Sequence, residues 1–433
     1  MGDIDTKDLL VAHQITLLEF IPAAHPNILR HVVRLIREKP GALSLLKTSA
    51  LAVGIAFARR VTDEEIGEEI AKLMAELVEN SAICEELKSQ LAQATSRDSS
   101  VIRSRIYSVS FAHLQALEAG IASEHARIST DSSSIHWLYK EILSSVLNES
   151  DLLAQLDALD TFVDVALSGK ENAKALSDQG IVSAIYNLME KSRESPDAGE
   201  FYTYGTRFLC YMARSYPQVI KSFPDFVRRL LVETRMFDQL GIVARLNVFD
   251  HFASLCYSLE AKSMMEEIFK GTQDLENTLG AAGAATTMGT MEMKCRTLQA
   301  ITLIFENSTP TQAASWYEKL GGKALTHVSV SNVKKPFPDA KNAIYDFWHQ
   351  LFAYPEIVNE FVNFKDFVEW ALDDKSESEP EYEIRKRSLI RRIIDLSASS
   401  SDLIKIDADL VGKLHNYLKP ATAPAPRVEE MAL

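Results

Sequence analysis

The sequence contains two glycine clusters that could hold a phosphate group, Gly280-Ala-Ala-Gly283 and Gly321-Gly322-Lys323. A Walker-type loop needs the spacing G-x-x-x-x-G-K-[ST] after a strand, because its backbone amides and its lysine must converge on one phosphate chain. Neither cluster has this spacing, and we expect no strand before either. We therefore interpret both as connections between helices, with a loop over 280–290.

Other candidates for nucleophilic or metal chemistry lack their partner residues. Ser44-Leu-Leu-Lys47 matches the S-x-x-K pattern of a serine nucleophile, but the companion motifs of that enzyme class are missing. The 10 histidines form no H-x-x-x-H or H-E-x-x-H pair, which a helix would need to present two ligands to one metal ion. We expect no cofactor, and a metal site assembled from distant histidines is the alternative.

The four cysteines lie too far apart in sequence for a zinc site, a redox pair or a disulfide framework; they are Cys84, Cys210, Cys256 and Cys295. Cys210 and Cys256 each stand between a leucine and a tyrosine. Unpaired cysteine is among the most buried residue types, so we expect both in the core, with a reactive thiol as the alternative. The four tryptophans are also expected in the core rather than in a ligand cage: Trp137, Trp316, Trp348 and Trp370.

Two clusters of charge remain, and each has two interpretations. The basic residues of 385–392 are expected on a solvated helix face beside Glu381, Glu383 and Asp395, or in contact with an acidic protein partner. The buried side of the same helix is assigned to Ile384, Leu389, Ile390, Ile393 and Ile394. Four glutamates at 64, 65, 68 and 69 stack like charges one turn apart, as a solvated face or as a docking surface for a basic partner.

Composition limits the class of protein. The chain has 433 residues, 46% hydrophobic and 24% charged, with only 17 Gly and 14 Pro, which disfavours an all-β fold. The net charge of −14 opposes binding to nucleic acid or to an anionic membrane. The first residues are acidic, unlike a secretory signal, and the longest uncharged stretch, 277–291, is too short to span a bilayer. We expect a cytoplasmic protein, and a nuclear pool is compatible with these features.

Apolar residues recur with helical spacing through most of the chain, and no run alternates with period two, so we expect no substantial strand. One helical stripe consists of Ile181, Val182, Ile185, Leu188 and Met189. The unit around it is predicted as a helix over 151–167, a short helix over 171–177 and a third helix from Ile181 onward.

Such units recur about every 46 residues. Equivalent positions near the end of one helix in each unit are Ala166, Cys210, Cys256, Phe305, Phe352 and Leu396. The following helices give a second series, Val182, Val227, Leu275, Leu325, Val368 and Val411. A period of roughly 40–47 residues built from two or three helices is typical of HEAT and armadillo repeats. We therefore predict an all-α, right-handed HEAT/armadillo-like α-solenoid.

The regularity of the repeat suggests three regions. We assign irregular helical repeats to 1–150, regular repeats to 151–419 and a disordered tail to 420–433, which contains three prolines. Within the first region, helices are expected over 9–20, 28–37, 43–58 and 64–94. Loops are expected over 128–134, 192–200, 280–290 and 373–381.

Five short phrases, in their order and spacing, carry a resemblance to a known family. They begin at Gln179 (QGIVSAIYNLM), Phe223 (FPDFV), Lys294 (KCRTLQAI), Pro336 (PFP) and Phe364 (FKDFV). Through them, residues 152–420 resemble the non-ATPase regulatory subunit 5 family of the 26S proteasome, which are assembly chaperones of HEAT/armadillo type. The resemblance implies a non-enzymatic protein that binds the C-terminal domain of a proteasomal AAA ATPase subunit. Binding would take place while the base of the regulatory particle assembles, and would delay docking on the core particle.

A solenoid of this kind presents a long concave groove, which we assign to the last helix of each unit. Polar residues opposite the apolar stripes of these helices are the expected protein contacts: Asn187, Glu190, Arg228, Arg229, Glu369, Asp373, Lys413 and Asn416. Nucleic acid, membrane and small-molecule substrates are not expected as partners. Another HEAT/armadillo scaffold or adaptor is the alternative function, and an enzyme is a third for which no catalytic constellation is found.

Overall fold

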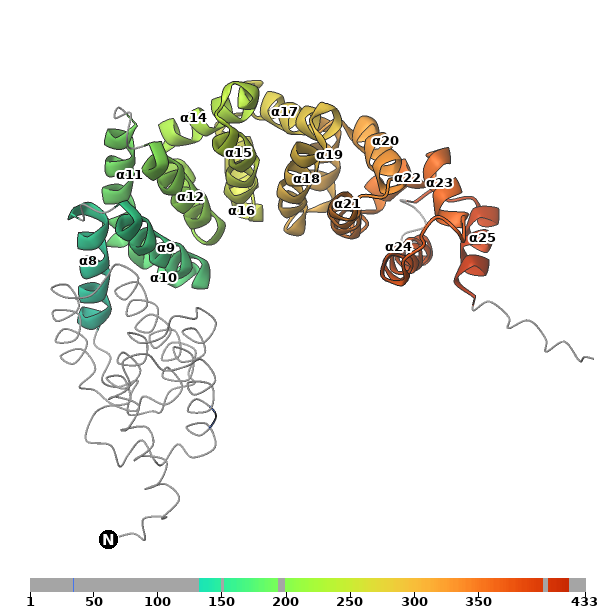
Figure 1. The fold of residues 1–433 in the computed structure, drawn as a ribbon, viewed down its shortest axis with the longest axis horizontal. Coiled ribbons are helices and arrows are strands. Elements are labelled where there is room, and N and C mark those ends of the chain that lie inside the picture. Colours follow the sequence, from blue (N-terminus) through green and yellow to red (C-terminus); the bar gives the residue numbers. More distant parts are fainter. Residues whose placement is uncertain (1–33, 35–131, 149–151, 194–198, 400–403, 420–433) are drawn as a thin grey trace, which may run out of the picture. The chain divides into compact units, whose positions relative to one another are not determined.

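A computed structural model describes residue 34 and residues 132–148, 152–193, 199–399 and 404–419 (Figure 1). The described residues contain helices and turns but no strand. The chain divides into two compact units, Met1–Tyr216 and Pro217–Leu433, and each is considered by itself. Several expectations lie outside the described residues: the N-terminal helices, the four glutamates of 64–69, Cys84 and the tail over 420–433.

After α8 (Ser132–Asn148), the helices follow one another as a first, a second and a third helix in each repeat. The first helices are α9 (Leu152–Ser168), α12 (Gly199–Ser215), α15 (Ile242–Leu255), α18 (Met291–Glu306), α21 (Pro338–Leu351) and α24 (Pro380–Ser399). The second helices are α10 (Lys170–Asp178), α13 (Gln218–Ser222), α16 (Leu259–Ile268), α19 (Pro310–Lys319) and α22 (Pro355–Val362). The third helices are α11 (Ile181–Ser192), α14 (Pro224–Arg235), α17 (Asp274–Met288), α20 (Gly322–Val333), α23 (Lys365–Leu372) and α25 (Ala408–Leu418). A 3₁₀ turn, η2 (Phe237–Gln239), precedes α15.

This order confirms the predicted all-α, HEAT/armadillo-like repeat. The predicted helices over 151–167 and 171–177 differ from α9 and α10 by one residue at each end, and α11 begins at Ile181, as predicted. The first predicted series falls in the last two turns of each first helix or directly after its end. Five of its six side chains are fully buried, namely Ala166, Cys210, Cys256, Phe305 and Phe352. The second series falls within the third helices, so both periodicities describe the same three-helix unit.

Local sequence determines where several helices begin. The hydroxyls of Ser258, Thr290 and Thr309 accept hydrogen bonds from backbone amides in the first turns of α16, α18 and α19, at 3.1 to 3.3 Å. Pro224 and Pro355 are the first residues of α14 and α22, where proline is tolerated because the first backbone amides of a helix have no partner within it.

Side chains from one repeat satisfy the free carbonyls at the helix ends of the repeat before it. The Phe305 carbonyl at the end of α18 accepts bonds from Gln350 Nε2, at 3.0 Å, and from the Tyr354 hydroxyl. Arg392 Nε donates to the carbonyl of Phe352 at 2.9 Å. The last carbonyls of a helix have no partner within it, so these bonds fix the register of neighbouring repeats in unit 2.

The C-terminal repeats share an aromatic core. Trp348 is fully buried and its ring lies 5.1 Å from that of Trp370 and 5.5 Å from that of Phe367. Aromatic pairs of this geometry contribute about 0.5–1.5 kcal/mol each beyond their buried area. Trp316 is 1% exposed and Trp370 is 2% exposed, which confirms the core prediction for these residues, whereas the side chain of Trp137 lies outside the described residues.

The loop predicted over 280–290 is wrong, because α17 extends through Met288. Its Ala- and Gly-rich sequence serves close packing. A Cβ atom on Gly283 would lie 1.8 Å from the carbonyl oxygen of Leu320, so only glycine allows α17 to approach that backbone. The loop predicted over 128–134 ends earlier than predicted, because α8 begins at Ser132. The loop predicted over 373–381 is confirmed: α23 ends at Leu372 and α24 begins at Pro380.

Candidate protein-binding surface

The third helices of unit 2 bury one face and expose another. In Figure 1, α14, α17, α20 and α23 follow the upper border of this unit, and the first helices lie beneath them. In α14, for example, Phe226, Val227, Leu230 and Leu231 are buried, while Arg228 on the opposite side is exposed. The third helices therefore place charged side chains in solvent at regular intervals, as a protein-binding surface requires.

The predicted contact residues of α11 and α14 lie on such exposed or half-exposed faces. Asn187 is exposed, and Glu190 lies 3.6 Å from Arg193 one turn away. On α14, Arg228 Nη1 lies 3.0 Å from Asp225 Oδ1, whereas Arg229 is partly buried. The structure places these residues without showing that they bind a partner.

The predicted residues of α23 and α25 are also on the surface. Glu369 pairs with Lys365 at 3.4 Å, and Lys413 pairs with Asp409 at 2.5 Å. Lys419 Nζ donates to Asn416 Oδ1 at 2.8 Å. Exposed ion pairs of this kind contribute only about 0–1 kcal/mol each, so a partner could replace them at little expense in free energy.

Asp373 differs from the other predicted residues because it also belongs to a polar cluster that the sequence analysis missed. Its carbonyl oxygen accepts a bond from Lys386 Nζ at 2.6 Å, and its carboxylate accepts a bond from the backbone amide of Lys375 at 2.9 Å. These bonds hold the connection between α23 and α24 in place, which is the role of Asp373 in the fold. Its role in binding a partner stays a prediction.

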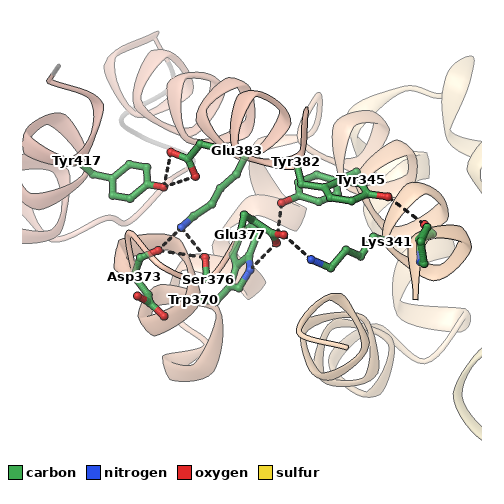
Figure 2. Close-up of polar contacts among 11 residues, drawn as sticks. Lys341, Tyr345, Trp370, Asp373, Ser376, Glu377, Tyr382, Glu383 and Tyr417 are labelled. Carbon is green, nitrogen blue, oxygen red and sulfur yellow. Dashed lines mark hydrogen bonds and ion pairs between the residues drawn. The ribbon is translucent and has the colours of Figure 1, made fainter. Parts of the chain in front are cut away.

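Glu377 is the centre of this cluster, and its side chain is fully buried (Figure 2). One carboxylate oxygen lies 2.5 Å from Lys341 Nζ. The other accepts bonds from the Tyr345 hydroxyl at 3.0 Å and from Trp370 Nε1 at 3.4 Å. Burial, and then the neighbouring carboxylate, raise the pKa of Tyr345, so the phenol keeps the proton that it donates.

Lys386 is also buried, which corrects the prediction that the whole basic run lies on a solvated face. It donates to the Ser376 hydroxyl at 2.8 Å as well as to the Asp373 carbonyl, and its Nζ lies 4.4 Å from the centre of the Tyr417 ring. Burial lowers the pKa of Lys386 to about 8. Ile384, assigned to the buried side, is instead 68% exposed.

Two other residues of the basic run, Arg385 and Arg387, form salt bridges within unit 2. Arg387 pairs at 2.7 Å with Glu383, one of the acidic residues predicted to lie beside the basic run. Arg385 pairs with Asp346 of the preceding repeat. Glu383 also accepts the Tyr417 hydroxyl at 3.0 Å (Figure 2). The cluster therefore joins α21, α23, α24 and α25, and it stabilises the surface on which four of the predicted contact residues lie.

The chemistry of the cysteines matches the core prediction. Cys210 and Cys256 are fully buried, and burial raises the pKa of Cys256 to about 12, so it is not a thiolate near neutral pH. Among the residues that the structure describes, no group of three His, Cys, Asp or Glu side chains could hold a metal ion. No helix within these residues has the length and apolar character needed to cross a membrane.

Comparison with known proteins gives a family. A family model described as "Proteasome non-ATPase 26S subunit" matches residues 1–430. No curated protein is significantly similar in sequence.

Among solved structures, the karyopherin Kap121p bound to Nup53p aligns with a TM-score of 0.47 and 11% identity, over 95% of this chain and 43% of Kap121p. A designed armadillo repeat protein in complex with the peptide (KR)4 aligns with a TM-score of 0.42 and 12% identity, over 58% of this chain and 98% of that one.

Proposed function

We propose a function from the premise that this chain belongs to the proteasome non-ATPase 26S subunit family: it is an assembly chaperone for the base of the regulatory particle. In this proposal the chain binds the C-terminal domain of a proteasomal AAA ATPase subunit and delays its docking on the core particle. It acts in the cytoplasm and leaves before the particle is complete. The family match over residues 1–430 is the observation that carries the proposal.

The repeat architecture supports a mechanism based on binding alone. A row of third helices can distribute a standard interface of about 1,600 Å² over several repeats. Six of the eight predicted contact residues lie in unit 2, on α14, at the end of α23 and on α25. The chaperone would block premature docking sterically, by covering the ATPase domain, and would need no nucleotide of its own.

Exposed charges are suited to such a transient complex. Arg228 and its partner Asp225 have side chains that are 63% and 79% exposed. Charged residues at the rim of an interface mainly raise the association rate and select the partner, while the affinity stays low enough for release. A chaperone that must dissociate during assembly needs this combination.

The test is a titration of the purified full chain with the isolated C-terminal domains of all six proteasomal ATPases. We expect one-to-one binding to one or two of the six domains. The variant Arg228→Glu should weaken that binding at least about tenfold, equivalent to about 1.4 kcal/mol. Lys221→Glu is the matched control, because Lys221 is also exposed and paired but lies on the second helix α13.

Each result decides one part of the proposal. Binding to none of the six domains would reject the chaperone function and leave another protein-binding scaffold. If Arg228→Glu and Lys221→Glu weaken binding equally, the effect follows net charge alone. The chaperone function would then stand, but the third helices would not be the contact surface.

A further inference from the structure

Unit 2 exposes a row of apolar side chains where each third helix connects to the next first helix. The most exposed members are Ile242 (78%), Met288 (80%), Phe337 (49%) and Ile384 (68%). Ile242 and Ile384 lie near the starts of α15 and α24, Met288 is the last residue of α17, and Phe337 directly precedes α21. Their separations of 46, 49 and 47 residues match the repeat, so each repeat contributes one. We call these four residues the apolar edge.

The four positions share one edge because successive first helices pack side by side and run in the same direction. α15 packs on α18, α18 on α21, and α21 on α24. Near the start of α24, the Tyr382 hydroxyl donates to the Pro338 carbonyl at the start of α21, at 3.4 Å. Helices packed in this way lie about 8–10 Å apart, so the edge offers about one apolar side chain per 10 Å.

A small cavity of about 20 Å³ is lined by residues that lie close in sequence to Met288 and Phe337. Its lining comes from α17, α18, α20 and α21 and includes Thr286, Met291, Cys295, Val328 and Ile344. Thr286 and Met291 flank Met288 in sequence, and the lining residue Ala340 follows Phe337 by three positions. Because methionine side chains are flexible, this cavity can adapt to an incoming apolar side chain.

An exposed carboxylate accompanies each member of the apolar edge; these are Asp238, Glu292, Asp339 and Glu381. None of the four carboxylates pairs with a cation among the described residues. The last three lie in the first turns of their helices, where they also stabilise the helix dipole. Exposed lysines are fewer at these connections, with Lys334 and Lys375. A positively charged partner is therefore the complementary one.

We propose that the apolar edge docks an amphipathic helix of another protein, one with apolar residues about seven positions apart and lysine or arginine beside them. Seven residues of an α-helix rise about 10.5 Å, which matches the spacing of the repeats. Flexible apolar surfaces that include methionine are typical of grooves that receive amphipathic helices. Three of the four members of the apolar edge lie outside the third helices, and none is among the eight predicted contact residues, so the inference does not depend on the proposed function.

The test uses the full chain and three fluorescent synthetic peptides of about three heptads each. The first has leucine at seven-residue spacing flanked by lysine, the second has the same composition in scrambled order, and the third replaces lysine with glutamate. The variant Met288→Ser/Phe337→Ser removes the centre of the apolar edge. Leu259→Ser is the control, because Leu259 is 44% exposed at the start of α16, away from this edge.

We expect the patterned basic peptide to bind at least about tenfold more tightly than either other peptide, and the double variant to lose that preference while Leu259→Ser keeps it. Bound peptide should also slow alkylation of Cys295, followed by peptide mass spectrometry, since this thiol lines the cavity. Equal binding of patterned and scrambled peptides, or no effect of the double variant, would overturn the proposal. Sedimentation that shows a dimer broken by Phe337→Ser would overturn it too, because a second copy would then occupy the edge.

Discussion

The two glycines of α17 should respond to alanine in opposite directions. At Gly283 an added Cβ would lie 1.8 Å from the oxygen and 2.6 Å from the carbon of the Leu320 carbonyl. Both atoms belong to the backbone, so no side chain can move aside and the helix must shift. Overpacking of this kind typically destabilises by about 1–3 kcal/mol, more than the gain of about 1 kcal/mol from the higher helix propensity of alanine.

Gly280 is the matched control in the same helix. Its nearest neighbour to an added Cβ is the Lys319 carbonyl oxygen at 3.9 Å, an ordinary contact. Gly280→Ala should therefore stabilise the protein by about 0.5–1 kcal/mol, because glycine is the poorer helix former. Urea unfolding gives both free energies, and hydrogen exchange in α17 and α20 gives the local effect. Stabilisation by both substitutions would refute the close packing of α17 on Leu320.

Three further tests concern ionisable groups that are buried or partly buried, Glu377, Lys386 and Asp250. Glu377→Ala should lower the free energy of unfolding by about 3–5 kcal/mol, because it leaves Lys341 buried without its carboxylate partner. The double variant Glu377→Ala/Lys341→Met should recover most of this loss, and urea unfolding measures both. The pKa of Lys386 is about 8 in the folded protein, below its usual value of 10.5. Between pH 8 and 10.5, the unfolded chain therefore holds a proton on this lysine that the folded protein has lost. This lysine therefore makes stability rise with pH across that window, and Lys386→Met should remove that part of the rise. Burial raises the pKa of Asp250 from 3.8 to about 6, so its contribution to stability is present below about pH 4 and is lost as pH rises through 6. Asp250→Asn should therefore gain stability relative to the wild-type protein between pH 4 and 7 in thermal melts.

The repeat could be predicted from sequence because each unit buries the same apolar positions. Phe305 and Phe352 occupy equivalent places and are both fully buried, so their spacing reports the packing period directly. A three-helix unit cannot bury its own stripe, and the periodicity of the stripe is therefore the periodicity of the fold.

The features that the sequence did not reveal depend on contacts between distant residues. Lys386 is one of five basic residues within eight positions, and only the carbonyl of Asp373 and the hydroxyl of Ser376 explain why it alone is buried. The Ala- and Gly-rich sequence of α17 has the composition of a loop, and the backbone near Leu320 makes it a tightly packed helix. Neither partner is close enough in sequence to be seen by periodicity.

The chaperone function and a permanent place in the particle predict different compositions of the proteasome. Quantitative mass spectrometry of purified base precursors and of mature 26S particles measures this directly. The proposal predicts that the chain is stoichiometric with an ATPase subunit in the precursors and nearly absent from the mature particle. Equal stoichiometry in the mature particle would contradict it and would make the chain a constitutive subunit.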